Sequence, residues 1–266
     1  MVSQQSRHQN RRWTGYTLRG IAFGVLAAAA QCAGAVDNLP AYNTYQAVPF
    51  VVGGGGGLAA DMVGYLNDKL KGKYRFDLNV LARDKLNQTL EKDPNFKGVV
   101  LFLNPMFVAD PDKKKYHWTP AIIADSNAVI SLNTKKVDYV DPDSLKGLKF
   151  AGVAGNRYAG LDERFGKDIQ RENSNEELSN IRKVSSGKAD VTIMASSTYR
   201  FLLKQLGDAS PVKSTLYVSP KPHAKFDRHL FSANGDAALA KELDAVAAGM
   251  KGDPAWKAIA GKYGLE

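Results

Sequence analysis

The feature that most constrains the fold is a regular alternation of strand-like and helix-like segments along the chain. Predicted strands are short runs rich in apolar and β-branched residues, and predicted helices carry apolar residues three and four positions apart. The predicted strands cover residues 45–52, 74–81, 98–103, 128–132, 148–153, 189–194 and 215–218. The predicted helices cover residues 59–70, 86–90, 161–169, 174–181, 196–206, 239–250 and 254–263. A capping box at Ser174–Glu177 and an N-cap at Asp253 mark the starts of two of them. This alternation predicts an α/β fold with mostly parallel sheets covered by helices.

The alternation falls into two sets, and the second begins near Asp143. Two such sets, followed by a helical tail, predict two α/β lobes. Ligands of open α/β sheets bind beyond the carboxyl ends of the strands. Candidate site residues are therefore those that directly follow each predicted strand.

The N-terminus has the composition of a secretory signal peptide. Residues 1–19 contain four arginines and no acidic residue, residues 21–30 form an apolar run, and the small residues Ala33 and Ala35 follow. The pattern predicts cleavage after Ala35 and export to the periplasm. The run is too short to span a bilayer, which takes about 20 apolar residues. A lipid-modified Cys32 and a twin-arginine signal at residues 11–12 are the alternatives.

Removal of residues 1–35 lowers the net charge of the chain and removes its single cysteine. Four of the 36 basic residues leave with this segment, so 32 remain against 27 acidic residues, and the net charge falls from +9 to +5. This mild charge, without aromatic residues between the lysines, argues against a nucleic-acid partner. The single cysteine, Cys32, also leaves, which excludes disulfides and thiolate chemistry.

Several short motifs occur in the order found in one known family. They are Pro49–Phe50, the Gly-x-x-x-Asp pattern at residues 57–61, the segment 116–121, the Asp-Ser-Leu-Lys-Gly-Leu pattern leading into a strand at 143–153, Gly-Lys-Ala-Asp at 187–190, and Lys-Tyr-Gly at 262–264. Through these motifs the chain resembles the bacterial family 3 extracellular solute-binding proteins, which serve ABC transporters for polar amino acids.

The resemblance implies a type II periplasmic-binding-protein fold, with two lobes joined by a two-stranded hinge. Lobe 1 would comprise residues 36–132 and 222–266, and lobe 2 residues 133–221. The implied function is that of a monomeric periplasmic protein that closes on a small polar ligand, anionic ligands included. The closed form would be read by a membrane permease or a sensor. No cofactor is implied.

The positions that read the ligand depart from this family. Its members clamp the ligand carboxylate with an arginine a few residues before the segment at 116–121, but residues 110–115 contain no arginine. Lys113 or Lys114 would supply a point charge without the bidentate fork of an arginine. The acidic residue that binds the ligand's amino group is expected near Ala195–Ser196, where none is present. These departures argue against an ordinary amino-acid ligand.

Ten residues at the ends of predicted strands are the candidate ligand-binding residues. Eight of them follow a strand, and Tyr45 and Phe50 flank the end of the first strand, where aromatic residues commonly line a pocket. They are Tyr45, Phe50, Asn104, Phe107, Gly155, Asn156, Arg157, Tyr158, Ser196 and Ser197. Arg157, next to a predicted helix start, suits a carboxylate or phosphate. Ser196 or Ser197 would also cap the following helix. For each residue the competing interpretation is an ordinary turn, cap or core position.

Other functions have weaker support in the sequence. The glycines at 53–57 lack the ending of a phosphate-binding loop, so a flexible loop is the better interpretation. His117, His223 and His229 lack the spacing of metal ligands, and the last two are predicted to lie on the surface. No motif of a nucleophilic enzyme is present. We therefore predict a binding protein without catalytic residues. The alternatives are a periplasmic lyase, dehydratase or hydrolase on the same fold, or an accessory factor with a blocked cleft.

Overall fold

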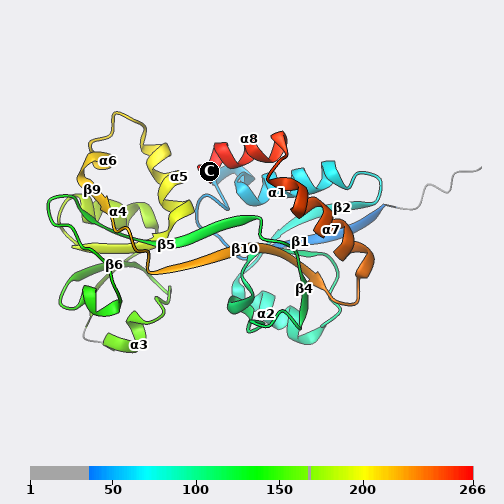
Figure 1. Ribbon diagram of the computed structural model, residues 1–266, viewed down its shortest axis with the longest axis horizontal. Helices are drawn as coiled ribbons and strands as arrows, with labels where there is room; N and C mark the ends of the chain where they lie inside the picture. The colour runs from blue at the N-terminus through cyan, green and yellow to red at the C-terminus, as the bar shows by residue number, and fades with distance from the viewer. Residues whose placement is uncertain (1–35, 167–168, 266) are drawn as a thin grey trace, which may run out of the picture. The chain divides into compact units, whose positions relative to one another are not determined.

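The computed structural model describes residues 36–166 and 169–265, so the predicted signal peptide over residues 1–35 lies outside the described residues. Strands and helices alternate throughout this part of the chain (Figure 1). The strands are β1 (Asp37–Asn43), β2 (Tyr74–Val80), β3 (Val99–Leu103), β4 (Tyr116–Trp118), β5 (Ile123–Leu132), β6 (Lys149–Val153), β7 (Gln170–Ser174), β8 (Val191–Ala195), β9 (Leu216–Val218) and β10 (Ala224–Ala233). The α-helices are α1 (Leu58–Lys69), α2 (Arg83–Lys92), α3 (Leu161–Phe165), α4 (Glu177–Ser185), α5 (Ser196–Leu206), α6 (Pro211–Thr215), α7 (Ala237–Met250) and α8 (Pro254–Tyr263). Short 3-10 helices are η1 (Gly53–Gly55), η2 (Pro105–Val108) and η3 (Pro142–Leu145).

The strands form one mixed sheet in the order β2-β1-β3-β10-β5-β8-β6-β7, with β4 beside β10 and β9 beside β5. Pairing is parallel among β1, β2 and β3 and among β6, β7 and β8. It is antiparallel wherever β5 or β10 takes part. The predicted α/β class with two parallel sets of strands is therefore confirmed.

Two long strands, β5 and β10, connect the two sets. Residues 123–127 of β5 pair with residues 224–228 of β10, and residues 127–131 of β5 then pair with β8. Beyond Arg228, β10 changes partner and pairs with β3 and β4. Figure 1 shows these two strands running side by side between the groups of helices. We call the set β1–β4 with α1, α2, α7 and α8 lobe 1, and the set β6–β9 with α3–α6 lobe 2. The predicted residues at which each lobe ends stay a prediction.

Helices cover both faces of the sheet in each lobe. In lobe 1, Leu66 of α1, Leu243 of α7 and Trp256 of α8 pack in one core cluster, and Leu86 of α2 packs in a second. In lobe 2, Leu161 of α3 lies in one cluster and Leu202 of α5 in another. The central strands are therefore covered on both faces. This explains why β3 is a continuous apolar run with every residue buried.

The N-terminal strand was assigned to the wrong residues. The predicted strand at 45–52 consists of turns and one isolated bridge, and the first strand is instead β1. β1 was missed because it contains Pro40, which ordinarily argues against a strand. β3 pairs only with Ala41 and Tyr42, so Pro40 lies where β1 has a strand on one side only. A proline is tolerated at such a position.

Two further predictions at the ends of elements were wrong. The predicted helix at 161–169 ends at Phe165, and the polar residues 170–174 form the edge strand β7. Ser174 belongs to that strand, so α4 begins at Glu177 rather than at the expected capping box. By contrast, Asp253 caps α8 as predicted, because its side chain accepts a hydrogen bond from the Ala255 amide.

Among residues 36–166 and 169–265, no helix combines the length and the apolar character that a membrane span requires.

Candidate functional site

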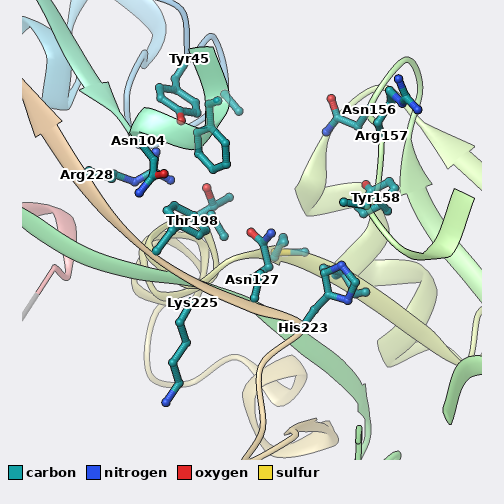
Figure 2. Close-up of a pocket in the computed structure, with 18 of the residues that line it drawn as sticks. Tyr45, Asn104, Asn127, Asn156, Arg157, Tyr158, Thr198, His223, Lys225 and Arg228 are labelled. Atoms are coloured by element: carbon teal, nitrogen blue, oxygen red, sulfur yellow. The ribbon is translucent and has the colours of Figure 1, made fainter. Parts of the chain in front are cut away.

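A cavity lies between the strand ends of the two lobes and has a volume of about 550 Å³. This is within the ~300–1,000 Å³ typical of small-molecule sites. Residues from lobe 1, lobe 2 and the connecting strands share in lining it (Figure 2). The lining residues are Tyr45, Ala47, Phe50, Asn104, Met106, Phe107, Asn127, Asn156, Arg157, Tyr158, Ala159, Glu177, Ile193, Met194, Ala195, Thr198, His223, Ala224, Lys225, Phe226 and Arg228.

Seven of the ten candidate residues line this cavity. They are Tyr45, Phe50, Asn104, Phe107, Asn156, Arg157 and Tyr158. The other three, Gly155, Ser196 and Ser197, do not. The rule that sites form beyond strand ends thus brought together residues up to 54 positions apart, from Asn104 to Tyr158, whereas Tyr45 and Phe50 line the cavity although the strand predicted at 45–52 is absent. Their role as ligand contacts stays a prediction.

On the lobe 1 side, the position of Phe50 depends on a close approach of the backbone at Gly57. Gly57 has a φ of 123°, and a Cβ atom there would lie 2.4 Å from the Phe50 carbonyl oxygen. The next amides, of Leu58 and Ala59, donate to the carbonyls of Pro49 and Phe50 at 2.8 and 3.0 Å. The start of α1 therefore fixes the Phe50 backbone, and only glycine fits at residue 57.

Asn104 connects lobe 1 to β10. Its side-chain oxygen accepts a hydrogen bond from the Met106 amide at 3.0 Å, and its side-chain nitrogen donates to the Asp227 carbonyl at 2.9 Å. Met106 and Phe107 follow on η2 and are 68% and 42% exposed, which is unusual for large apolar side chains. The cavity therefore has an apolar edge on this side.

On the lobe 2 side, the loop after β6 is not the helix N-terminus that the sequence predicted. Residues 154 and 155 form a turn, residues 156–158 have no regular secondary structure, and α3 begins only at Leu161. The Arg157 side chain is 83% exposed and lies 3.5 Å from Glu163. Figure 2 shows it extending away from Thr198 and Asn127. The arginine fork proposed for an anionic ligand therefore does not face into the cavity.

A different arginine, Arg171 of β7, holds this loop in place. It donates to the carbonyls of Val153 and Asn156 at 2.9 and 2.8 Å and lies over the Tyr158 ring at 5.0 Å. The Tyr158 hydroxyl accepts a hydrogen bond from the Val153 amide at 2.9 Å. Burial raises the pKa of Tyr158, so its phenol is neutral at physiological pH.

The start of α5 also differs from the prediction. The residue before the helix is Ala195, and neither Ser196 nor Ser197 makes the expected capping bond. Ser196 lies 2.6 Å from the Ser126 hydroxyl, and the buried Ser197 donates to Asp125 at 2.7 Å. Thr198, the next residue of α5, lines the cavity and donates to the Val48 carbonyl at 2.8 Å.

The strongest electrostatic feature of the site is a buried ion pair between the two connecting strands. Arg228 of β10 lies 2.8 Å from Asp125 of β5, and their side chains are 2% and 0% exposed. Asp125 also accepts hydrogen bonds from the amides of Ser126 and Ser197 at 2.9 and 3.1 Å. Since the pair is neutral as a whole and its carboxylate is fully coordinated, Arg228 brings little net charge to the cavity.

Three aromatic rings enclose the Arg228 guanidinium. Its central carbon lies 4.6 Å from the ring of Tyr45, 4.7 Å from that of Phe50 and 5.0 Å from that of Phe226. Tyr45 and Phe50 also stack on each other at 4.6 Å. Distances below about 6 Å give favourable cation–π contacts, and these are stronger when the cation is desolvated. Arg228 therefore fills the aromatic part of the site with the chain's own cation.

Two titratable groups on the cavity wall have shifted pKa values. Burial raises the pKa of Glu177 to about 7, against which the Asn180 side chain acts by donating a hydrogen bond. Burial lowers the pKa of His223 below its usual value, and its ring lies 2.9 Å from the Tyr139 hydroxyl. At neutral pH, therefore, His223 is uncharged and Glu177 changes between its two forms.

The predicted surface position of the two late histidines was wrong for His229. It is 6% exposed, and its ring lies 2.8 Å from the Thr119 carbonyl oxygen. Lys113 and Lys114, considered as substitutes for the missing arginine, are not among the cavity residues. Within residues 36–166 and 169–265, no group of three or more His, Cys, Asp or Glu side chains is placed to hold a metal ion.

Solved structures of similar fold were found, although no protein-family model and no curated protein matches the sequence. The GluR0 ligand-binding core from Nostoc punctiforme, in complex with L-glutamate, has a TM-score of 0.60 at 14% identity, covering 85% of this chain and 98% of that chain. An ancestral arginine-binding protein bound to arginine has a TM-score of 0.59 at 16% identity, covering 85% and 97%. The ancestral amino acid-binding protein AncCDT-1, a precursor of cyclohexadienyl dehydratase, has a TM-score of 0.60 at 15% identity, covering 86% and 96%.

These comparisons confirm the predicted type II periplasmic-binding-protein fold and the resemblance to amino-acid-type solute-binding proteins. Nearly the whole of each neighbour is matched. At these identities the likeness shows the fold and not the ligand.

Proposed function

We propose that the chain is a periplasmic solute-binding protein that closes on a small polar ligand and presents it to a membrane permease or sensor. The observation that carries this proposal is the cavity of about 550 Å³, to which both lobes and both connecting strands contribute residues. A ligand in contact with both lobes stabilises the form in which they are closed together. The neighbours of known structure include proteins bound to glutamate and arginine, which supports this function.

The anionic ligand suggested by the sequence has no support in the position of Arg157. That side chain pairs with Glu163 outside the cavity, and Arg228 is already paired with Asp125. The proposal therefore keeps a small polar ligand and leaves out a negative charge.

The test is native mass spectrometry of the protein purified from its periplasm, followed by identification of any molecule released on denaturation. We expect one small molecule per chain, rebinding to the emptied protein and raising its unfolding temperature. The proposal fails if the protein is empty and a broad metabolite library neither stabilises it nor changes its small-angle scattering.

An enzyme of the lyase or dehydratase class is a second candidate, favoured by Glu177. A carboxyl group with a pKa of about 7 in a cavity is suited to donate and accept protons at neutral pH. One neighbour is described as a precursor of a dehydratase. Incubation of the released molecule with the protein distinguishes the two, because an enzyme converts it and a binding protein returns it unchanged. The open cavity argues against the third candidate, an accessory factor with a blocked cleft.

A further inference from the structure

Of the titratable side chains on the cavity wall, all but one are paired with an opposite charge, are uncharged at neutral pH or extend away from the cavity. Arg228 is paired with Asp125, and Arg157 pairs with Glu163. Lys225 is exposed, and Figure 2 shows its ammonium group far from the other labelled side chains. His223 is hydrogen-bonded to Tyr139 and is uncharged at neutral pH.

Glu177 is different, and among the described residues that line the cavity it alone carries a carboxyl group. It is half-buried at the first position of α4. Its side chain receives one long hydrogen bond, from the Asn180 side-chain nitrogen at 3.4 Å. In the part of the chain that the structure describes, no lysine, arginine or histidine lies within 4.0 Å of its oxygens.

Charged groups on the neighbouring elements are occupied with other partners or lie at the surface. α4 packs against β5, β6, β7, β8 and α6. Arg171 of β7 pairs with Asp162, Lys183 of α4 with Glu172 of β7, and Lys213 of α6 with Asp208. Asp125 of β5 is paired with Arg228. The remaining charged groups of these elements are the exposed Lys149 of β6 and Arg182 of α4, and the nearby phenol is that of Tyr158. The Glu177 carboxylate is therefore not neutralised by the chain itself.

We propose that Glu177 sets the ligand class of this cavity by accepting an organic cation, an ammonium or guanidinium group, from the bound solute. This inference rests on the proposed solute-binding function and names the ligand chemistry of the same site. A desolvated carboxylate without an ionic partner is unfavourable, and a cation placed against it removes that penalty. The aromatic part of the site does not compete for the cation, because Arg228 already fills it.

Proton release accompanies binding of such a cation. With its pKa near 7, Glu177 holds a proton in about half of the molecules at neutral pH. A bound cation favours the charged carboxylate and so expels that proton. A neutral or anionic ligand has no such effect.

Isothermal titration calorimetry at pH 7, in two buffers with different ionisation enthalpies, tests the inference. The probes are agmatine, L-arginine and n-butylguanidine as cations, n-butylurea as the neutral analogue of n-butylguanidine, and glutarate as an anion; neither of the last two carries an ammonium group. We expect a cation to bind most tightly, with a heat that depends on the buffer. Glu177→Gln keeps the shape and should weaken that binding about 10- to 100-fold, the effect of losing one charge-assisted hydrogen bond. Glu176→Gln is the matched control, because this exposed neighbour does not line the cavity.

The two proposals fail in different ways. If n-butylurea, glutarate or a co-purified solute without a cationic group binds best, or if Glu177→Gln binds the cation as tightly as the original chain, the inference is overturned and the solute-binding function stands. If no probe binds, native mass spectrometry finds the purified protein empty, and the metabolite library neither stabilises it nor changes its small-angle scattering, both proposals fail together.

Discussion

Replacing Arg228 by methionine tests the interpretation that the ion pair between β5 and β10 is a main support of the site. The change leaves the Asp125 carboxylate buried at 0% exposure without its cation. Breaking a buried pair by removing one partner destabilises a protein by about 3–5 kcal/mol. The loss of three cation–π contacts acts in the same direction. For a chain of this size, each 1 kcal/mol lowers Tm by about 2–4 °C, so we expect Tm to fall by about 6–20 °C.

The assay is urea unfolding followed by circular dichroism, with Lys225→Met as the control. Lys225 lies on the same strand but is exposed, so its replacement should change the free energy of unfolding by less than about 0.5 kcal/mol. A second variant adds Asp125→Asn to Arg228→Met. Asparagine is uncharged but keeps an oxygen that can accept the hydrogen bonds of the Ser126 and Ser197 amides.

The effect of Asp125→Asn on the stability of Arg228→Met tests whether the two charges are coupled. If the pair is coupled as described, Asp125→Asn destabilises the original chain but raises the stability of Arg228→Met, because it removes the unpaired charge. Equal destabilisation by Asp125→Asn in both backgrounds would refute the reasoning. So would a loss below about 1 kcal/mol in Arg228→Met, since that is the ordinary effect of a substitution.

Three further predictions follow from single residues. Gly57→Ala should lower the free energy of unfolding by about 1–3 kcal/mol and weaken ligand binding through Phe50, because the new Cβ atom meets the Phe50 carbonyl. Gly53→Ala is the control, because its new Cβ atom would have no neighbour within 4 Å. Urea unfolding measures the stability of both variants, and ligand titration measures their affinity. Glu177→Gln should be as stable as the original chain at pH 4 and more stable at pH 8, by at most about 3 kcal/mol; the reason is that a raised carboxyl pKa in the folded state lowers stability as the pH rises from about 4.5 to about 7. Asp253 behaves in the opposite way, because hydrogen bonds from Lys69 and the Ala255 amide lower its pKa to about 2. Its contribution to stability is present above about pH 4 and is lost as the pH falls toward 2, so the Tm difference between the original chain and Asp253→Asn should shrink over that interval. A constant Tm difference would contradict the assignment.

The sequence predicted the cavity residues that follow shortly after a strand along the chain. Asn104 follows the apolar strand β3, and Asn156 follows β6, so the rule about strand ends selected both. The same rule selected Ser197, which follows β8 but points to the buried Asp125. Strand ends show where a site lies, but not which way each side chain points.

The residues that the sequence reasoning missed depend on contacts between distant segments. Arg228 and Asp125 are 103 positions apart, and no local sequence pattern predicts their pairing. One signal was available, because residues 224–227 alternate between apolar and charged side chains as a strand does, and an arginine two positions before the apolar pair Leu230–Phe231 needs a partner. Glu177 was interpreted as a cap, since the burial that raises its pKa comes from the tertiary fold.

The central claim, that two lobes close on a ligand held between them, is tested most directly by one distance in solution. Apart from Cys32 in the predicted signal peptide, the chain has no cysteine, so Lys85→Cys on α2 and Lys146→Cys after η3 supply one exposed labelling site on each lobe. Single-molecule energy transfer between dyes at these sites should show the distance shorten when the solute identified by native mass spectrometry is added, and lengthen again on its removal. A solute that binds at one per chain while the distance between the dyes stays constant would contradict the account.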